Sequence, residues 1–127
     1  MIVNDPATLA EVTTVFRRYE AAFIANDMAG MDALFWQDER VVRYGIAEQQ
    51  HGAAEVAAFR RTQPSDDLER DLARTVITTF GTDFATASTL FYRASAPGLV
   101  GRQMQTWVRM EDGWRVVAAH VSIIAEP

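Results

Sequence analysis

The chain has 127 residues, of which 49% are hydrophobic, so it can bury a single sizeable core without cross-links. It contains no cysteine, which excludes a disulfide framework, a thiolate metal site and a cysteine nucleophile. Its formal net charge of -5 repels a phosphate backbone over most of the surface, so we expect no nucleic-acid partner.

The beginning of the chain bears on where the protein is found. Residues 1–6 lack the basic and apolar regions of a secretion signal, and no apolar run is long enough to cross a bilayer. We therefore expect one soluble, cytoplasmic domain over residues 1–127, with no membrane partner. All 12 basic residues are arginine, which excludes reactions that require a lysine amine.

A long helix is predicted from Pro6 to about Asn26. Asp5 is a suitable N-cap, and Pro6 suits the first helical position because an N–H would have no partner there. Apolar residues recur at helical spacing on one face, which we expect to be buried: Val12, Val15, Phe16, Tyr19 and Phe23. Tyr19 is either a core aromatic with a satisfied hydroxyl or the phenol of a functional site.

Shorter elements follow this helix. Asn26-Asp27 caps a second helix from Met28 to Trp36, and a polar turn then leads to a strand from Val41 to Gly45. A short partner for that strand is predicted from Gln49 to His51, followed by a third helix from Gly52 through about Arg61.

Four long strands are predicted in the second half of the chain, after a loop at residues 62–68. They are rich in Val, Ile, Thr and aromatic residues: Leu72 to Phe80, Phe84 to Arg93, Val100 to Met110 and Trp114 to Ile124. Helices followed by an antiparallel meander indicate an α+β fold, in which the helices cover one face of the sheet. A curved sheet around the long helix leaves a cavity at its open end.

Arg43 is a candidate for ligand binding. Alternation along the strand places it on the same face as Val41 and opposite Val42 and Tyr44. If this face is buried, the guanidinium needs an anion, and a carboxylate matches its planar donors best. Otherwise Arg43 faces solvent or pairs with a structural glutamate.

The last hairpin gathers polar residues on one face. A two-residue turn at Asp112-Gly113 pairs Gln105 with His120 and Gln103 with Ser122. The resulting face is typical of a polar pocket rather than a dry core: Gln103, Gln105, Trp107, His120 and Ser122. A three-residue turn would shift the partners to Arg102 and Met104, and the two glutamines could then lie on the solvent side of the sheet.

The sequence lacks the common catalytic motifs. It has no nucleophile elbow, no Gly-rich phosphate loop and no HExxH zinc motif. The chain has 2 histidines, His51 and His120, and no acidic residue is clearly placed beside either. We therefore predict no metal site and no cofactor.

Several strings resemble those of one family. VRYG at 42–45, GRQMQTWV at 101–108 and GWRVVAAHVS at 113–122 are similar to the AtzH-like and HpxZ-like proteins of the nuclear transport factor 2-like, or SnoaL-like, superfamily. The resemblance extends over nearly the whole chain. It implies a cone-shaped, cystatin-like α+β fold with three N-terminal helices packed on a curved antiparallel sheet around an internal pocket.

The resemblance also implies an activity. Family members act with amidases in the breakdown of cyanuric acid and related nitrogen compounds. The implied reaction is that of a decarboxylating amidohydrolase, which converts 1,3-dicarboxyurea, or a similar small carboxylated urea, to allophanate. Tyr19 and Arg43 occupy the positions of the family's catalytic tyrosine and arginine, and Gln103, Gln105 and His120 are predicted to bind this small anionic substrate.

Other interpretations of the sequence stay open. The domain is either this enzyme or a non-catalytic binding or accessory domain associated with an amidase. In the enzyme, either His120 activates water or the substrate breaks down in a site that only polarises it. An open sheet face needs a cover, so we expect a homodimer or a higher homo-oligomer.

Overall fold

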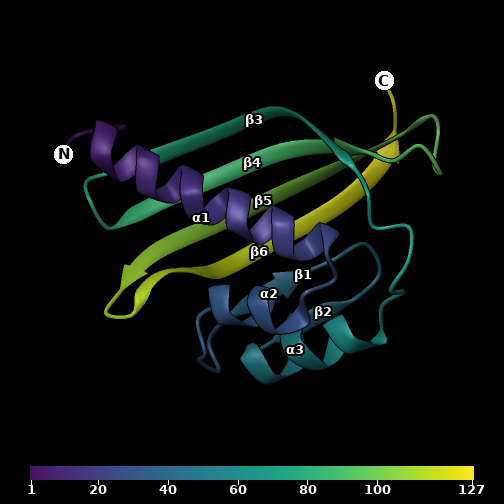
Figure 1. Ribbon diagram of the computed structural model, residues 1–127, viewed down its shortest axis with the longest axis horizontal. Helices are drawn as coiled ribbons and strands as arrows, with labels where there is room; N and C mark the ends of the chain where they lie inside the picture. Colours follow the sequence, from purple (N-terminus) through teal and green to yellow (C-terminus); the bar gives the residue numbers. More distant parts are fainter.

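The computed structural model of the protein describes residues 1–127 and shows an α+β fold (Figure 1). The helices are α1 (Pro6–Ile24), α2 (Met28–Leu34) and α3 (Ala53–Thr62). The strands are β1 (Val42–Tyr44), β2 (Gln49–His51), β3 (Asp71–Phe80), β4 (Phe84–Tyr92), β5 (Leu99–Met110) and β6 (Gly113–Ala125). Every predicted element is present, with ends that differ by a few residues.

The strands form one 6-stranded sheet in the order β2-β1-β6-β5-β4-β3. All neighbouring strands are antiparallel except β1 and β6, which are parallel. The predicted antiparallel meander of the four long strands is present, and β1 joins it in parallel beside β6. Parallel strands need a long crossover between them, and here the crossover consists of β2, α3 and the other three strands of the meander.

The long helix α1 lies across the concave face of the four long strands, whereas α2 and α3 lie below β1 and β2 (Figure 1). Asp5 caps α1, because its Oδ2 accepts hydrogen bonds from the Thr8 backbone N–H at 3.1 Å and from Thr8 Oγ1 at 2.8 Å. Asp27 caps α2 by accepting from the Gly30 N–H. No helix combines the length and the apolarity that a membrane span requires.

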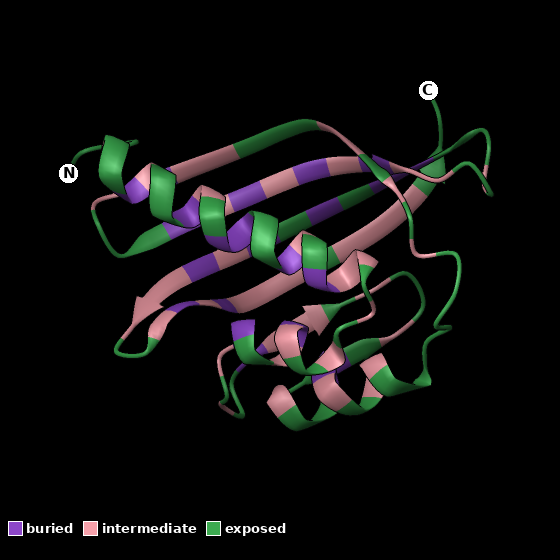
Figure 2. Ribbon diagram, in the orientation of Figure 1, coloured by how far each residue is buried: buried purple, intermediate pink, exposed green.

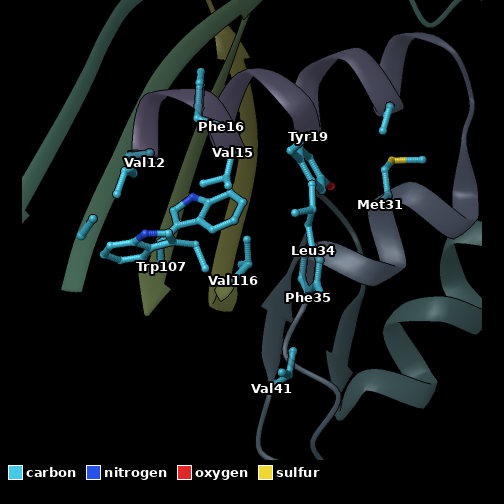
Figure 3. Close-up of a cluster of buried hydrophobic side chains, with 14 of the residues drawn as sticks. Val12, Val15, Phe16, Tyr19, Met31, Leu34, Phe35, Val41, Trp107 and Val116 are labelled. Atoms are coloured by element: carbon cyan, nitrogen blue, oxygen red, sulfur yellow. The ribbon is translucent and has the colours of Figure 1, made fainter. Parts of the chain in front are cut away.

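The core lies between α1 and the concave face of the sheet. Burial alternates along the central strands, as Figure 2 shows for β4 and β5. Val12 of α1 packs against Trp107 of β5 and Val116 of β6, and each of the three residues is 0% exposed (Figure 3). This packing holds α1 at a fixed height above the sheet and leaves the other end of the concave face open to a cavity.

The register of the β5–β6 hairpin differs from the predicted one. Met110 pairs with Gly113, so the turn residues are Glu111 and Asp112, with Gly113 in the following position at a φ of 122°. Type I turns favour glycine there, and the prediction had placed it one position earlier in the turn. A bulge between Thr106 and Trp107 then moves the register back by one residue, so that Gln105 pairs with Ala119.

Candidate functional site

A cavity of about 590 Å³ opens between the C-terminal half of α1, α3 and the concave face of the sheet. Its size is within the roughly 300–1,000 Å³ that is usual for small-molecule sites. The charged residues of its wall are Arg43, Arg60, Arg70, Arg93, Glu48, Asp66 and Asp67. Two further carboxylates, on Glu20 and Asp32, pair with wall arginines from behind. Four guanidinium groups and five carboxylates thus lie in or just behind the wall, so the cavity binds an anion only where a guanidinium keeps donors that no carboxylate occupies.

Tyr19 lies in this wall. Its side chain descends from the buried face of α1 beside Leu34 and Phe35 (Figure 3), and the residue is 8% exposed. The Tyr19 hydroxyl accepts a long hydrogen bond of 3.4 Å from Arg60 Nη1. Since this length exceeds that of a good N–H···O bond, the Tyr19 hydroxyl keeps the capacity for a stronger hydrogen bond with a bound ligand.

Arg60 comes from α3 and is held by the other two helices of the domain. Its Nε donates to Asp32 Oδ1 at 3.0 Å, and its Nη1 contacts Met31 Sδ at 3.2 Å. Burial alone would lower the pKa of Arg60, but the Tyr19 hydroxyl and the Asp32 carboxylate outweigh it and raise that pKa. A permanent positive charge therefore lies beside the Tyr19 phenol.

Arg43 reaches the cavity from β1 and also pairs with a glutamate, so the structure combines two alternatives that the sequence left open. Its Nη1 donates to Glu48 Oε1 at 2.8 Å and to Gln50 Oε1 at 2.9 Å, and its guanidinium lies 5.2 Å from the centre of the Phe59 ring. Burial alone would raise the pKa of Glu48, but the hydrogen bond from Arg43 lowers it. The pair fixes one end of the guanidinium, and its Nε and Nη2 make no hydrogen bond with the protein.

Gln103 and Gln105 enter the cavity from β5 and are 5% and 3% exposed. Gln105 Oε1 accepts from Trp107 Nε1 at 3.0 Å, and Gln103 Oε1 accepts from Arg70 Nη2 at 3.1 Å. Opposite them on β6 are Ala119 and Val121. Because these two residues are apolar, neither glutamine finds a hydrogen-bond partner on β6.

Arg70 precedes β3 and has a side chain that is only 3% exposed. It forms two hydrogen bonds with Glu20, from Nε to Oε2 at 2.9 Å and from Nη2 to Oε1 at 2.7 Å. The guanidinium also lies 4.0 Å from the centre of the Phe23 ring. This double hydrogen bond neutralises the charge and holds α1 to the start of the meander.

The structure therefore places four of the five predicted site residues in one cavity: Tyr19, Arg43, Gln103 and Gln105. The prediction that His120 faces the pocket was wrong. It pairs with Met104 on the convex face and is exposed, because the turn and the bulge change the register. Arg102 shares that face, where its Nε donates to Ser122 Oγ at 2.9 Å.

Sequence reasoning missed Arg60, Arg70 and Arg93. In a chain whose basic residues are all arginine, residue type alone does not separate a cavity arginine from a surface one. The strand pattern did hold one signal, since Asp71 pairs with Tyr92 and so brings Arg70 and Arg93 to the same end of neighbouring strands. The structure contains no cluster of three His, Cys, Asp or Glu side chains suited to a metal ion.

The model of the AtzH-like family matches residues 1–127. The chain belongs to the AtzH-like family. No curated protein matches it. The resemblance found in the strand motifs is thereby confirmed at the level of the family.

Solved structures of similar proteins agree with this fold. A protein of unknown function from Pectobacterium atrosepticum SCRI1043 is 54% identical, with a TM-score of 0.94 over 97% of this AtzH-like chain and 95% of its own. A cystatin-like fold protein from Burkholderia xenovorans LB400 is 53% identical, with a TM-score of 0.95 over 100% and 99% of the two chains. A nuclear transport factor 2-like protein from Pseudomonas putida KT2440 is 20% identical, covers 91% and 86%, and has a TM-score of 0.80. The predicted nuclear transport factor 2-like, cystatin-like fold is confirmed.

Proposed function

We propose that this protein is a decarboxylating amidohydrolase that converts 1,3-dicarboxyurea, or a similar small carboxylated urea, to allophanate. The observation that carries the proposal is that Tyr19 and Arg43, from α1 and β1, line a single arginine-rich cavity. These are the residues that the AtzH-like resemblance marks as catalytic. A buried phenol and a guanidinium with unused donors suit a reaction on a small carboxylate.

Arg43 binds a substrate carboxylate in this proposal. Glu48 and Gln50 hold its Nη1, so the guanidinium is oriented before the ligand arrives. Its Nε and Nη2 together match the two oxygens of a carboxylate. A carboxylate bound there exchanges part of its hydration for two charge-assisted hydrogen bonds inside the cavity.

Tyr19 supplies the proton. The bond between the terminal carboxylate carbon and the urea nitrogen breaks, its electron pair stays on the nitrogen, and the phenol protonates that nitrogen as carbon dioxide leaves. Arg60, whose Nη1 lies 3.4 Å from the Tyr19 oxygen, stabilises the phenolate that remains. A proton from solvent then restores the phenol.

A binding role is the second candidate, and the position of His120 agrees with it as well as with the decarboxylation described above. Neither of the 2 histidines lines the cavity, so no imidazole is in place to activate water. The decarboxylation above needs no such base, because it consumes a proton and releases carbon dioxide. A protein that only binds the substrate would need no base either.

The deciding experiment measures conversion of 1,3-dicarboxyurea, generated in situ by an amidase, to allophanate. We expect Tyr19→Phe to lower the rate by about 10²-fold or more and Arg43→Ala by about 10²–10³-fold. Tyr44→Phe and Arg40→Ala are the matched controls, since Tyr44 and Arg40 have exposed side chains outside the cavity. Thermal melts establish that each variant is folded.

The two functions give different results in this assay. An enzyme accelerates allophanate formation above spontaneous decay, and both cavity variants lose that acceleration while both controls keep it. If the unsubstituted protein gives no acceleration but still binds the substrate, the enzyme proposal fails and the binding role stands.

A further inference from the structure

One end of the cavity is formed by Arg70 and Arg93, which have no role in the proposed reaction. Arg70 lies 4.7 Å and Arg93 5.1 Å from the centre of the Phe91 ring, measured from the guanidinium carbons. Both guanidinium groups also lie over Phe23, at 4.0 Å and 5.9 Å. Two positive charges therefore share the same two aromatic rings at one end of the cavity.

The two arginines differ in how their charges are compensated. Glu20 neutralises Arg70 through two hydrogen bonds, whereas Arg93 has neither a salt bridge nor a side-chain hydrogen bond with the protein. Asp67 also lines the cavity, but its Oδ2 accepts from Ser95 Oγ at 2.7 Å. Burial, and then the charge of Arg70, lower the pKa of Arg93, and the carboxylates of Asp67 and Glu20 offset only part of this effect. A half-buried cation without a partner is stabilised by an incoming anion.

Gln103 adds a free donor to this end of the cavity. Arginine can only donate, so Gln103 must present its Oε1 to Arg70, which leaves its Nε2 as the remaining group of the amide. This Nε2 is buried and has no hydrogen-bond partner in a residue that is 5% exposed. Buried donors of this kind are rare in proteins, and a ligand oxygen would satisfy this one.

We propose that Arg93 and the Gln103 amide form a second anion-binding subsite, which holds one terminal carboxylate of the substrate while Arg43 holds the other. This inference rests on the proposed function and defines its substrate class. The cavity selects a linear compound with a carboxylate at each end, and Arg93 is its specificity-determining residue. A compound with one carboxylate fills only one subsite.

Calorimetric titration with stable analogues tests the subsite without catalysis. Glutarate has a carboxylate at each end and the same chain length as 1,3-dicarboxyurea, and butyrate lacks one of the two carboxylates. We expect Arg93→Gln to weaken glutarate binding by about tenfold or more, because a charge-assisted hydrogen bond is lost, and to leave butyrate binding nearly unchanged. Arg102→Gln is the matched control, since Arg102 is exposed on the convex face.

Three results would overturn the subsite: equal loss for both ligands, no loss for either, or no glutarate binding by the unsubstituted protein. Arg93→Met keeps an apolar contact with Phe91 and should weaken glutarate binding as Arg93→Gln does. A loss of binding in only one of the two variants would indicate that this variant fails to fold. In the turnover assay we expect Arg93→Gln to raise KM more than it lowers kcat. If glutarate binding depends on Arg93 but no turnover occurs, the enzyme proposal fails and the subsite stands. If turnover occurs but does not depend on Arg93, the subsite fails and the enzyme proposal stands.

Discussion

The concave and convex faces of the β5–β6 hairpin use alternate residues of the same two strands but have different surroundings. On β5 the concave residues are Gln103, Gln105 and Trp107, all at most 5% exposed. Between them, Met104 points outward and is 59% exposed. A register shift of one residue moves a β6 side chain from one face to the other, so the bulge decides which β6 residues reach the cavity.

Because of this difference, β5 and β6 contribute different kinds of side chain to the cavity wall. β5 supplies the polar groups, and β6 supplies Ala119 and Val121, which are small or apolar and leave space for a ligand. Because β6 offers no polar partner, the β5 amides bind Trp107 and Arg70 instead. The concave face is thus a rigid polar wall, and substitutions on the two faces should have very different effects.

Trp107→Ala should have the largest effect on stability. Trp107 is 0% exposed, packs under α1 and donates its indole N–H to Gln105. Loss of this side chain leaves a cavity and should lower the free energy of unfolding by about 3–5 kcal/mol. Urea denaturation followed by circular dichroism measures the change. A loss below about 1 kcal/mol would contradict the view that the concave face is the core of the domain.

Glu20→Gln should have the next largest effect. It removes the carboxylate that neutralises Arg70, whose side chain is 3% exposed, while keeping the shape of the residue. An uncompensated buried charge should cost about 3 kcal/mol, at the low end for a broken buried pair because Glu20 is partly accessible. Denaturation with Arg109→Gln as the comparison tests this, since the Arg109–Glu11 pair is much more exposed and should contribute far less to stability.

Much of the fold could be predicted from the sequence because its signals are local. The Asp5 cap, the apolar face of α1 and the alternation along the strands each depend on neighbouring residues, and all three appear as expected. The family strings likewise indicated Tyr19 and Arg43. The cavity arginines depend instead on long-range packing: Arg70 meets a partner 50 residues away, at Glu20. The face on which His120 lies depends on a bulge that no residue type in the sequence predicts.

The convex face should control self-association more than folding. Cross-strand pairing sets Val76, Ser88, Met104, His120 and Tyr44 in one row across the sheet, and its three apolar members are 56%, 59% and 41% exposed. We expect a homodimer to cover this row. Met104→Glu should shift the protein toward monomer in sedimentation experiments while the melting temperature of the monomer hardly changes. An unchanged oligomeric state would show that a dimer through this face is not formed.

His120→Ala should have the smallest effect of all. The imidazole is exposed, lies 6.2 Å from the Tyr44 ring on the convex face and does not line the cavity. At matched oligomeric state we expect unfolding free energy to change by no more than about 0.5 kcal/mol and kcat/KM for 1,3-dicarboxyurea to stay the same. A strong loss of kcat in a folded variant would mean that His120 reaches the reacting atoms. In that case the bulge would be absent in solution, because without it the observed turn pairs Gln103 with His120 on the concave face.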